Sequence, residues 1–347
     1  MTLRSPSNRL KTTLRIALGT LVSLATLWLA FRNVRWAQVW EIVRRADIWL
    51  LLAALGSVLL TTAIRSERWR RMFYPQHRRL SPTRLFAMFL LGQMINALIP
   101  TRLGEIARAV LVGRDQHVSM AQALWTAATE KVLDAIVLLL FLGLIALLVP
   151  MPGWLQSAAW TLSTAVVVVL GVCVLAALQE QRTLRWLQRL EERWPWLRRL
   201  RLTRFAQALF DTLRLLRQPR QALRLAAYSV AAFLAAAATN WLTARAIGMP
   251  LSFRASLLLL SVLQISAVVP LPTTPGRVGV FHYLTVLALA IFAIEQDLAL
   301  SYSLLLHVLV YLPMSVGGPL ALWLLNVSWR SLTSTLREPP TPPAVTP

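Results

Sequence analysis

The hydrophobic positions of this chain form long uninterrupted runs, separated by short polar segments rich in arginine. Residues 135–178 contain no charged side chain, and residues 225–244 and 255–276 repeat this pattern. Because a bilayer-spanning helix needs about 20 mostly apolar residues, these runs predict an all-α polytopic membrane protein. We expect helices over 14–31, 48–64, 85–99, 104–113, 118–149, 158–178, 225–247, 255–269, 278–294 and 298–325.

The charges between the runs predict an orientation. Residues 65–84 carry seven Arg against one Glu, and residues 179–224 carry twelve Arg against four acids, so both segments should be cytoplasmic. Residues 150–157 are uncharged and residues 295–297 carry only acids, which fits the outside. Residues 32–47 disagree, because they carry four Arg and two acids yet must lie outside. This scheme places both termini in the cytoplasm of a multi-pass protein of the inner (plasma) membrane.

Two segments are too short or too broken for simple crossings. The run 85–99 is apolar, but 104–113 is short and carries Glu105 and Arg108. Ten residues rise only about 15 Å, roughly half of the hydrocarbon core, so a re-entrant hairpin fits better than two crossings. Segment 255–294 also starts and ends outside, as a re-entrant hairpin or as two full crossings.

The turns of these segments share the pattern Pro-x-Arg-aliphatic-Gly, at 100–104 and 275–279. With the opposite orientations, this predicts an inverted-topology repeat, the usual build of secondary transporters. The fold would contain about six full transmembrane helices and two broken-helix hairpins. We expect a single transmembrane domain (1–337) with repeat units 48–149 and 225–325, a cytoplasmic basic linker (179–224) and a disordered proline-rich tail (338–347).

Composition narrows the function classes. The net charge of +22 would suggest nucleic acid in a soluble protein, but 57% of the residues are hydrophobic and the arginines lie between apolar runs. There they orient helices and meet anionic lipid, so we expect no nucleic-acid partner. Cys173 is the only cysteine, and no P-loop, GxSxG or HExxH motif is present. We therefore expect no metal, no cofactor and no enzymatic activity.

Charges at membrane depth are costly and mark candidate sites. The first group is Arg102, Glu105 and Arg108, after the break at Pro100. Free N–H groups at the start of helix 104–113, together with Arg102, would form an anion site for a lipid phosphate. The alternative is a self-contained ionic network of the three side chains that holds the hairpin together.

The second group lies in the second turn. Arg277, flanked by Gly276 and Gly279, would bind the same head group, and His282 follows near one helical turn later. The alternative is a simple loop anchor.

The third group lies in one long apolar helix. Glu130 and Asp134 share a helical face, and Lys131 can pair with Asp134. The remaining acid, Glu130, is then a candidate proton carrier; the alternative is a counter-ion for an arginine of a hairpin. His307 and Tyr311 occupy a comparable place in the last helix, where His307 could be a proton-exchanging group or an interhelical hydrogen-bonding residue.

Four motifs together resemble the lysylphosphatidylglycerol-synthase membrane-region family, also called flippase-like: 96–108 (NALIPTRLGEIAR), 130–134 (EKVLD), 275–281 (PGRVGVF) and 65–69 (RSERW). The similarity spans roughly residues 15–325. The family's second motif often has a further glycine and an acid at the positions of Arg277 and His282. The resemblance implies an integral membrane protein that moves or binds phospholipids or polyprenyl lipids, without the aminoacyl-transferase domain of lysyl-lipid synthases.

The combined prediction is a lipid translocator that holds a phospholipid or polyprenyl-phosphate head group between its two hairpins. One alternative is a membrane-embedded lipid-phosphate transferase with Glu130 or Glu105 as its base. Another is a non-transporting scaffold for a partner enzyme of lipid synthesis. Transport by the purified chain in liposomes separates the first hypothesis from the other two.

Overall fold

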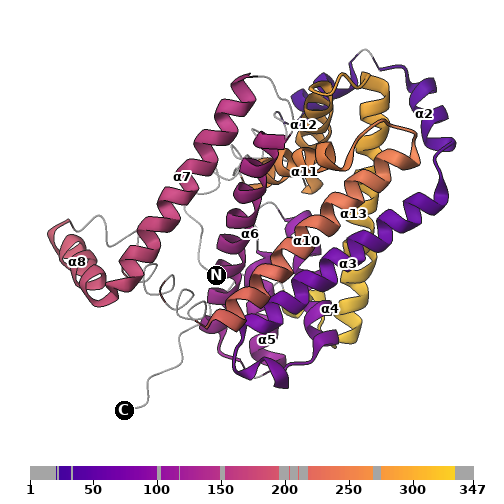
Figure 1. The fold of residues 1–347 in the computed structure, drawn as a ribbon. Helices are drawn as coiled ribbons and strands as arrows, with labels where there is room; N and C mark the ends of the chain where they lie inside the picture. The colour runs from indigo at the N-terminus through magenta and orange to yellow at the C-terminus, as the bar shows by residue number, and fades with distance from the viewer. Residues whose placement is uncertain are drawn as a thin grey trace, which may run out of the picture.

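The computed structural model describes residues 21, 23–32, 34–99, 103–116, 118–148, 153–194, 203, 210, 218–268 and 275–332, and within these ranges every regular element is a helix. A helix over residues 23–31 comes first. The others are α2 (Trp36–Arg44), α3 (Ile48–Met72), η1 (Gln76–Arg79), α4 (Pro82–Leu98), α5 (Gly104–Gln116), α6 (Met120–Leu148), α7 (Gly153–Leu178), α8 (Glu180–Arg193), α10 (Pro219–Ala246), α11 (Phe253–Val268), η3 (Pro275–Arg277), α12 (Val278–Ala290) and α13 (Gln296–Leu324). Figure 1 shows their arrangement.

The lengths of these helices confirm a polytopic membrane protein. Among the described residues, α3, α10 and α13 are long and apolar enough to cross a bilayer. The 29 residues of α6 and the 26 residues of α7 also have the length of a spanning helix. Many large apolar side chains of these helices are exposed, among them Leu60, Leu140 and Val316. In a membrane protein such a surface faces lipid.

Helix α3 continues to Met72, eight residues beyond its predicted end at residue 64. The charges that suggested a loop are compensated inside the helix. Arg70 and Arg71 both pair with Glu67, one turn before them, at 2.7 and 2.8 Å. Trp69, which directly precedes these arginines, is 1% exposed and belongs to the hydrophobic core. The arginines of this segment are therefore part of the bundle.

Helix α2 was not predicted, and it occupies part of residues 32–47, the connection whose charges disagree with the predicted outside location. Its Trp36 and Trp40 are exposed, as expected for a short helix that lies in the membrane interface. Arg35, directly before it, donates to Asp297 at 2.7 Å, and Arg45 pairs with Glu41 within the segment. Because Arg35 has an acidic partner outside the segment, the unpaired positive charge of this connection is smaller by one than its sequence suggested.

Two series of four helices correspond in order and length. In the first, α3, α4, α5 and α6 have 25, 17, 13 and 29 residues. In the second, α10, α11, α12 and α13 have 28, 16, 13 and 29. The two middle helices of each series rise only about 20–26 Å, less than the hydrocarbon core. This is the order of lengths expected for the predicted repeat units with a broken-helix hairpin in each.

The contacts between the two series are reciprocal. Helix α3 packs against α10 along its length, and the two run antiparallel, since Asp47 N–H donates to the Ala246 carbonyl at one end and Gln221 Nε2 to the Arg71 carbonyl at the other. Hairpin helix α4 packs against α13 of the other series, and α11 packs against α6 in return. The series are thus interleaved around one core.

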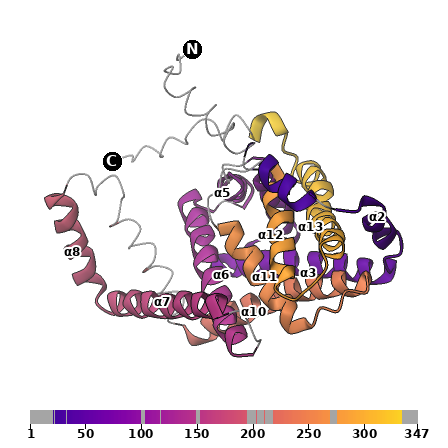
Figure 2. The ribbon, with the colours of Figure 1, turned by 90° about the horizontal axis from the view of Figure 1, so that it is seen from above.

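Helices α7 and α8 lie apart from the interleaved core in both views (Figures 1 and 2). Helix α7 packs on α6, and α8 follows it with no buried residue. Leucines and Trp186 are interspersed in α8 with four arginines, a pattern typical of a helix that lies in the membrane interface.

Candidate functional site

A buried ionic network joins α3, α5 and α6. Glu130 of α6 accepts from Arg108 of α5 at 3.0 Å and lies 3.8 Å from the Arg68 guanidinium of α3. Arg68 also contacts Asp134 at 2.7 Å. The side chains of Arg68, Arg108 and Glu130 are at most 6% exposed. Each buried charge of the network thus lies beside an opposite charge, which is the condition under which buried charges are tolerated.

Aromatic and polar neighbours fix Arg108 in this network. Its guanidinium lies over the ring of Trp69 at 5.0 Å and over that of Phe89 at 4.6 Å. The indole N–H of Trp69 donates in turn to Thr126 at 3.0 Å. Arg108 is therefore a positioned counter-ion of Glu130, the arrangement left open in the sequence analysis.

The first hairpin is closed by close backbone packing. The Gly104 N–H donates to the Asn96 side chain at 2.8 Å, and Asn96 donates to Glu105 at 3.2 Å. A Cβ atom on Gly104 would collide with the Gly92 carbonyl, so α4 and α5 meet where neither has a side chain. Arg102 lies outside the described residues, and its predicted role stays a prediction.

Lys131 pairs with Glu105 and not with Asp134, the partner predicted from the sequence. The Lys131 ammonium contacts Glu105 at 3.1 Å, and Asp134 contacts Arg68 instead. The one-turn spacing on α6 allowed a Lys131–Asp134 pair, but side chains of α3 and α5 approach both residues from other helices. Glu130 and Asp134 share their face with two arginines, which explains why two acids occupy neighbouring turns.

In the second hairpin the turn places Arg277 before α12. Gly276 has a φ of 70° and Arg277 a φ of 54°, both in the left-handed region, which is uncommon for arginine. The Tyr311 hydroxyl donates to the Gly276 carbonyl at 2.7 Å and so ties the turn to α13. The ring of His307 stacks on Tyr311 with 4.2 Å between centroids. Tyr311 and His307 of α13 therefore lie beside this turn.

The other predicted residues of this hairpin, Gly279 and His282, lie in α12, directly after the turn. His282 is buried, its Nδ1 lies 2.6 Å from the Ser303 hydroxyl, and its ring centroid is 5.1 Å from that of His307. A Cβ atom on Gly279 would collide with the Ser23 carbonyl, so this glycine permits close approach of the helix over residues 23–31. The structure thus places Gly279 at a helix contact.

A cavity of about 270 Å³ lies between the two series, bounded by α3 and α4 on one side and by α10, α11, η3, α12 and α13 on the other. Its polar lining includes two guanidiniums and three side-chain amides. It is lined by Val58, Thr61, Thr62, Arg65, Gln93, Ala236, Thr239, Asn240, Leu260, Leu263, Gln264, Arg277, Phe281, Leu306, Val310 and Tyr311. We call this the central cavity.

The central cavity has the chemistry of an anion site. Arg65 and Arg277 reach it from opposite series, and its lining contains no Asp or Glu. Arg65 Nε is buried and has no hydrogen-bond partner among the described residues. A buried guanidinium donor without an acceptor is costly, so a bound anion would satisfy it. Gln93 and Gln264 lie near the ends of corresponding hairpin helices, and their amides add donors to the same space.

Sequence analysis identified Arg277 but missed Arg65 as a site residue. Arg65 had been assigned to a cytoplasmic loop, although the resemblance of 65–69 to a family motif marked that region. Gln93, Gln264 and Asn240 carried no signal, since neutral amides are ordinary in apolar helices. No group of three or more potential metal ligands occurs in the described part of the chain.

The whole arrangement lies within a region that matches a known family. The family described as "Lysylphosphatidylglycerol synthase TM region" matches residues 16–318, which include both hairpins, the ionic network and the central cavity. No curated protein and no solved structure matches the chain. Because the match covers most of the sequence, the chain belongs to the lysylphosphatidylglycerol synthase TM-region family.

Proposed function

We propose that this protein is a lipid translocator that binds the phosphate head group of a phospholipid or polyprenyl lipid in the central cavity. The observation that carries the proposal is the pair Arg65 and Arg277, which reach one cavity from opposite series, while Arg65 Nε has no hydrogen-bond partner among the residues that the structure describes. Guanidinium groups bind phosphate through paired N–H donors, and the amides of Gln93 and Gln264 can bind its remaining oxygens.

The surroundings of the cavity favour a lipid over a soluble anion. Eleven of its sixteen lining residues are aliphatic, aromatic or threonine, so an anion there would be bounded by largely apolar surface. The exposed apolar faces of α3 and α13 indicate that the cavity lies within the bilayer. A ligand with a charged head and an apolar body matches both features.

The interleaved series suggest how such a lipid would cross. In transporters with inverted repeats, substrate binds at the interface of the repeats, where broken helices end. Here α4 and α11 bring Gln93 and Gln264 to the cavity from the two hairpins. We infer that the two hairpins expose the cavity alternately to the two sides of the plasma membrane, with both termini in the cytoplasm.

Liposome reconstitution tests the proposal. The purified chain should accelerate loss of fluorescently labelled phosphatidylglycerol from the inner leaflet, measured by adding a membrane-impermeant quencher. Arg65→Gln and Arg277→Gln should each weaken lipid binding about tenfold to hundredfold, because a charge-assisted hydrogen bond contributes roughly 1.5–3 kcal/mol. Arg277→Lys should restore part of the activity, since an ammonium lacks the planar pair of donors.

The matched control is Arg254→Gln, an exposed arginine of α11 outside the cavity lining. It should leave transport unchanged. Transport by the chain alone would exclude a pure scaffold, and intact lipid recovered afterwards would exclude a transferase. Full transport by folded Arg65→Gln and Arg277→Gln would refute the proposed site.

A further inference from the structure

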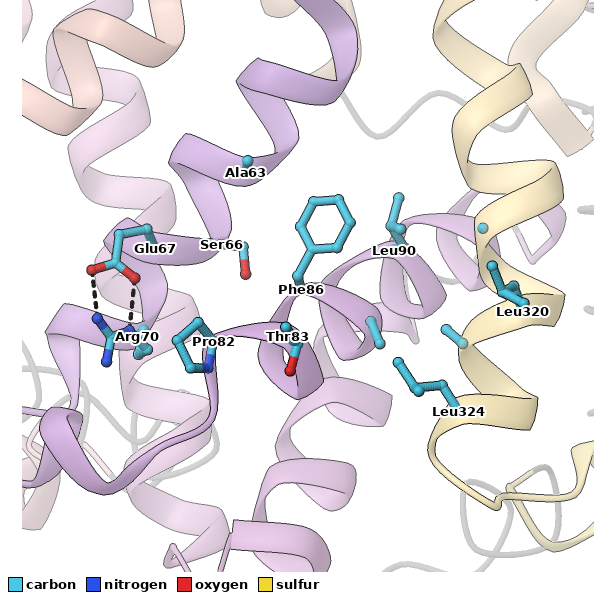
Figure 3. A pocket seen from close by; sticks show the side chains of 13 residues that line it. Ala63, Ser66, Glu67, Arg70, Pro82, Thr83, Phe86, Leu90, Leu320 and Leu324 are labelled. Carbon is cyan, nitrogen blue, oxygen red and sulfur yellow. Dashed lines mark hydrogen bonds and ion pairs between the residues drawn. The ribbon is translucent and has the colours of Figure 1, made fainter. Parts of the chain in front are cut away.

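A second, separate hollow lies between α3, α4 and α13, near the ends of these helices that adjoin the arginine-rich segment. Its volume is about 400 Å³, within the range of small-ligand sites. Figure 3 shows Glu67 and Arg70 at one end, with Phe86 and Leu90 between them and Leu320. It is lined by Ala63, Ser66, Glu67, Arg70, Pro82, Thr83, Phe86, Ala87, Leu90, Gly317, Leu320, Ala321 and Leu324. We call this the lateral groove.

The lateral groove and the central cavity share no lining residue. On α3, the groove is lined by residues 63, 66, 67 and 70, whereas the cavity is lined by 58, 61, 62 and 65. At 100° per residue these two sets lie on nearly opposite faces of the helix. The groove is therefore a distinct site.

The body of the groove is apolar and faces the bilayer. Leu320 and Leu324 are 60% and 45% exposed, and the neighbouring Trp323 is 75% exposed. Gly317 leaves space on α13, where an added Cβ atom would come within 2.8 Å of the Leu90 side chain. An apolar hollow that opens on a lipid-facing surface matches a hydrocarbon chain.

The polar end of the groove carries an excess of positive charge. Arg70 donates two hydrogen bonds to Glu67, at 2.7 and 2.8 Å, and Arg71 binds the same carboxylate at 2.8 Å. Two guanidiniums thus share one acid, which leaves one positive charge unbalanced. Arg78 and Arg79, in the following turn, are exposed and add to this charge. Ser66 and Thr83 supply hydroxyl groups at the same end.

We propose that the lateral groove binds one acyl chain of an anionic phospholipid, whose head group contacts Arg70 and Thr83 at the polar end. The apolar lining accounts for the chain, and the unbalanced charge selects an anionic head group over a zwitterionic one. This site does not depend on transport through the central cavity. It would hold lipid on the cytoplasmic side of the bundle.

Photo-cross-linking tests the chain-binding part. The full chain is reconstituted into phosphatidylcholine liposomes containing phosphatidylglycerol with a diazirine in one acyl chain, and labelled peptides are mapped by mass spectrometry. We expect labels on α3, α4 and α13 at Ala63, Phe86 and Leu320. Ala63→Phe places a ring in the groove from an exposed position and should remove most of this labelling.

The matched control is Ala53→Phe, which makes the same exchange at another exposed position of α3, outside both hollows. It should label like the wild type. Equal labelling of Ala63→Phe and Ala53→Phe would overturn the proposal. Absence of labelling in the wild type would also overturn the proposal. That is the result expected if a second copy of the chain covers the groove.

Charge variants test the head-group part. Arg70→Gln should lower the preference for phosphatidylglycerol over a phosphatidylcholine probe about fivefold, since one cation near a membrane surface contributes roughly 1 kcal/mol. Glu67→Gln removes the shared acid and should raise the same preference. Equal labelling by the two lipids in the wild type would refute the anionic specificity. Transport is measured in parallel, so loss of labelling with normal transport separates this site from the central cavity.

Discussion

The buried ionic network makes a sharp prediction about stability. Arg108→Met leaves Glu130, 3% exposed, with only the more distant Arg68 guanidinium at 3.8 Å. At an effective dielectric constant of about 20, the lost 3.0 Å contact had an attraction of about 5 kcal/mol, partly offset by desolvation. Breaking one partner of a buried pair typically costs about 3–5 kcal/mol. We therefore expect Arg108→Met to lower the free energy of unfolding by about 3 kcal/mol.

The partner variant and the double variant complete a cycle. Glu130→Gln keeps the shape of the side chain but leaves the Arg108 cation unbalanced, so it should also cost about 3 kcal/mol. The double variant Arg108→Met/Glu130→Gln removes one charge of each sign and restores neutrality. It should cost about 3 kcal/mol rather than the sum of about 6, a coupling of about 3 kcal/mol between the two side chains.

Unfolding in mixed micelles, followed by tryptophan fluorescence as the denaturing detergent is titrated, measures these differences. The matched control is Glu41→Gln, which breaks the solvent-exposed pair with Arg45 and should change stability by less than about 1 kcal/mol. Additive effects of the two single variants would show that Arg108 and Glu130 are not coupled. That result would refute the inference that the Arg108–Glu130 pair holds α5 against α6.

Three further predictions follow from other parts of the chain. In a Cys173→Ala background, cysteines at Ser157 and Gln188 should react with an impermeant maleimide from opposite sides; labelling from one side would contradict the proposed topology. The pH profile of lipid transport should be unchanged in Glu130→Gln, because two guanidiniums make Glu130 a counter-ion, whereas a flattened profile would establish the alternative proton role. Burial, followed by the charges of Arg71, Arg70 and Arg78, lowers the pKa of His77. The fold therefore loses stability as pH falls below the ordinary histidine value of about 6.5, and His77→Gln should abolish that part of the pH dependence of thermal unfolding.

The lengths of the apolar runs predicted the helices of the described residues because run length is a local feature. The run lengths locate the spanning segments, and the Pro-x-Arg-aliphatic-Gly turns locate the breaks. Helix α5, with 13 residues, is short, as the hairpin expected over 85–113 requires, and α12 ends at Ala290, four residues before its expected end at residue 294. The head-group role of the turn residues and the inverted relation of the two units remain predictions.

Charge-rich stretches were predicted less well, because their partners are distant in sequence. Residues 65–72 were assigned to a loop, but Arg68 is buried against Asp134 and Ser229, and α3 therefore continues through it. Lys131 has Asp134 one turn away, yet its contact is with Glu105 on another helix. In both cases the charged side chain finds its partner on another helix. Only the tertiary packing shows which partner that is.

The interleaving of the two series has a consequence for the order in which the protein is made. Arg68 on α3 finds its acids on α6 and donates to Ser229 on α10, 161 residues later in the chain. Helix α4 packs against α3 and α5, but it lacks its third partner until α13, the last of the series, has been synthesised. The first helices therefore enter the membrane with a charged, unmatched face. The contacts of the core can therefore be completed only after α13, near the end of the described chain, has been synthesised.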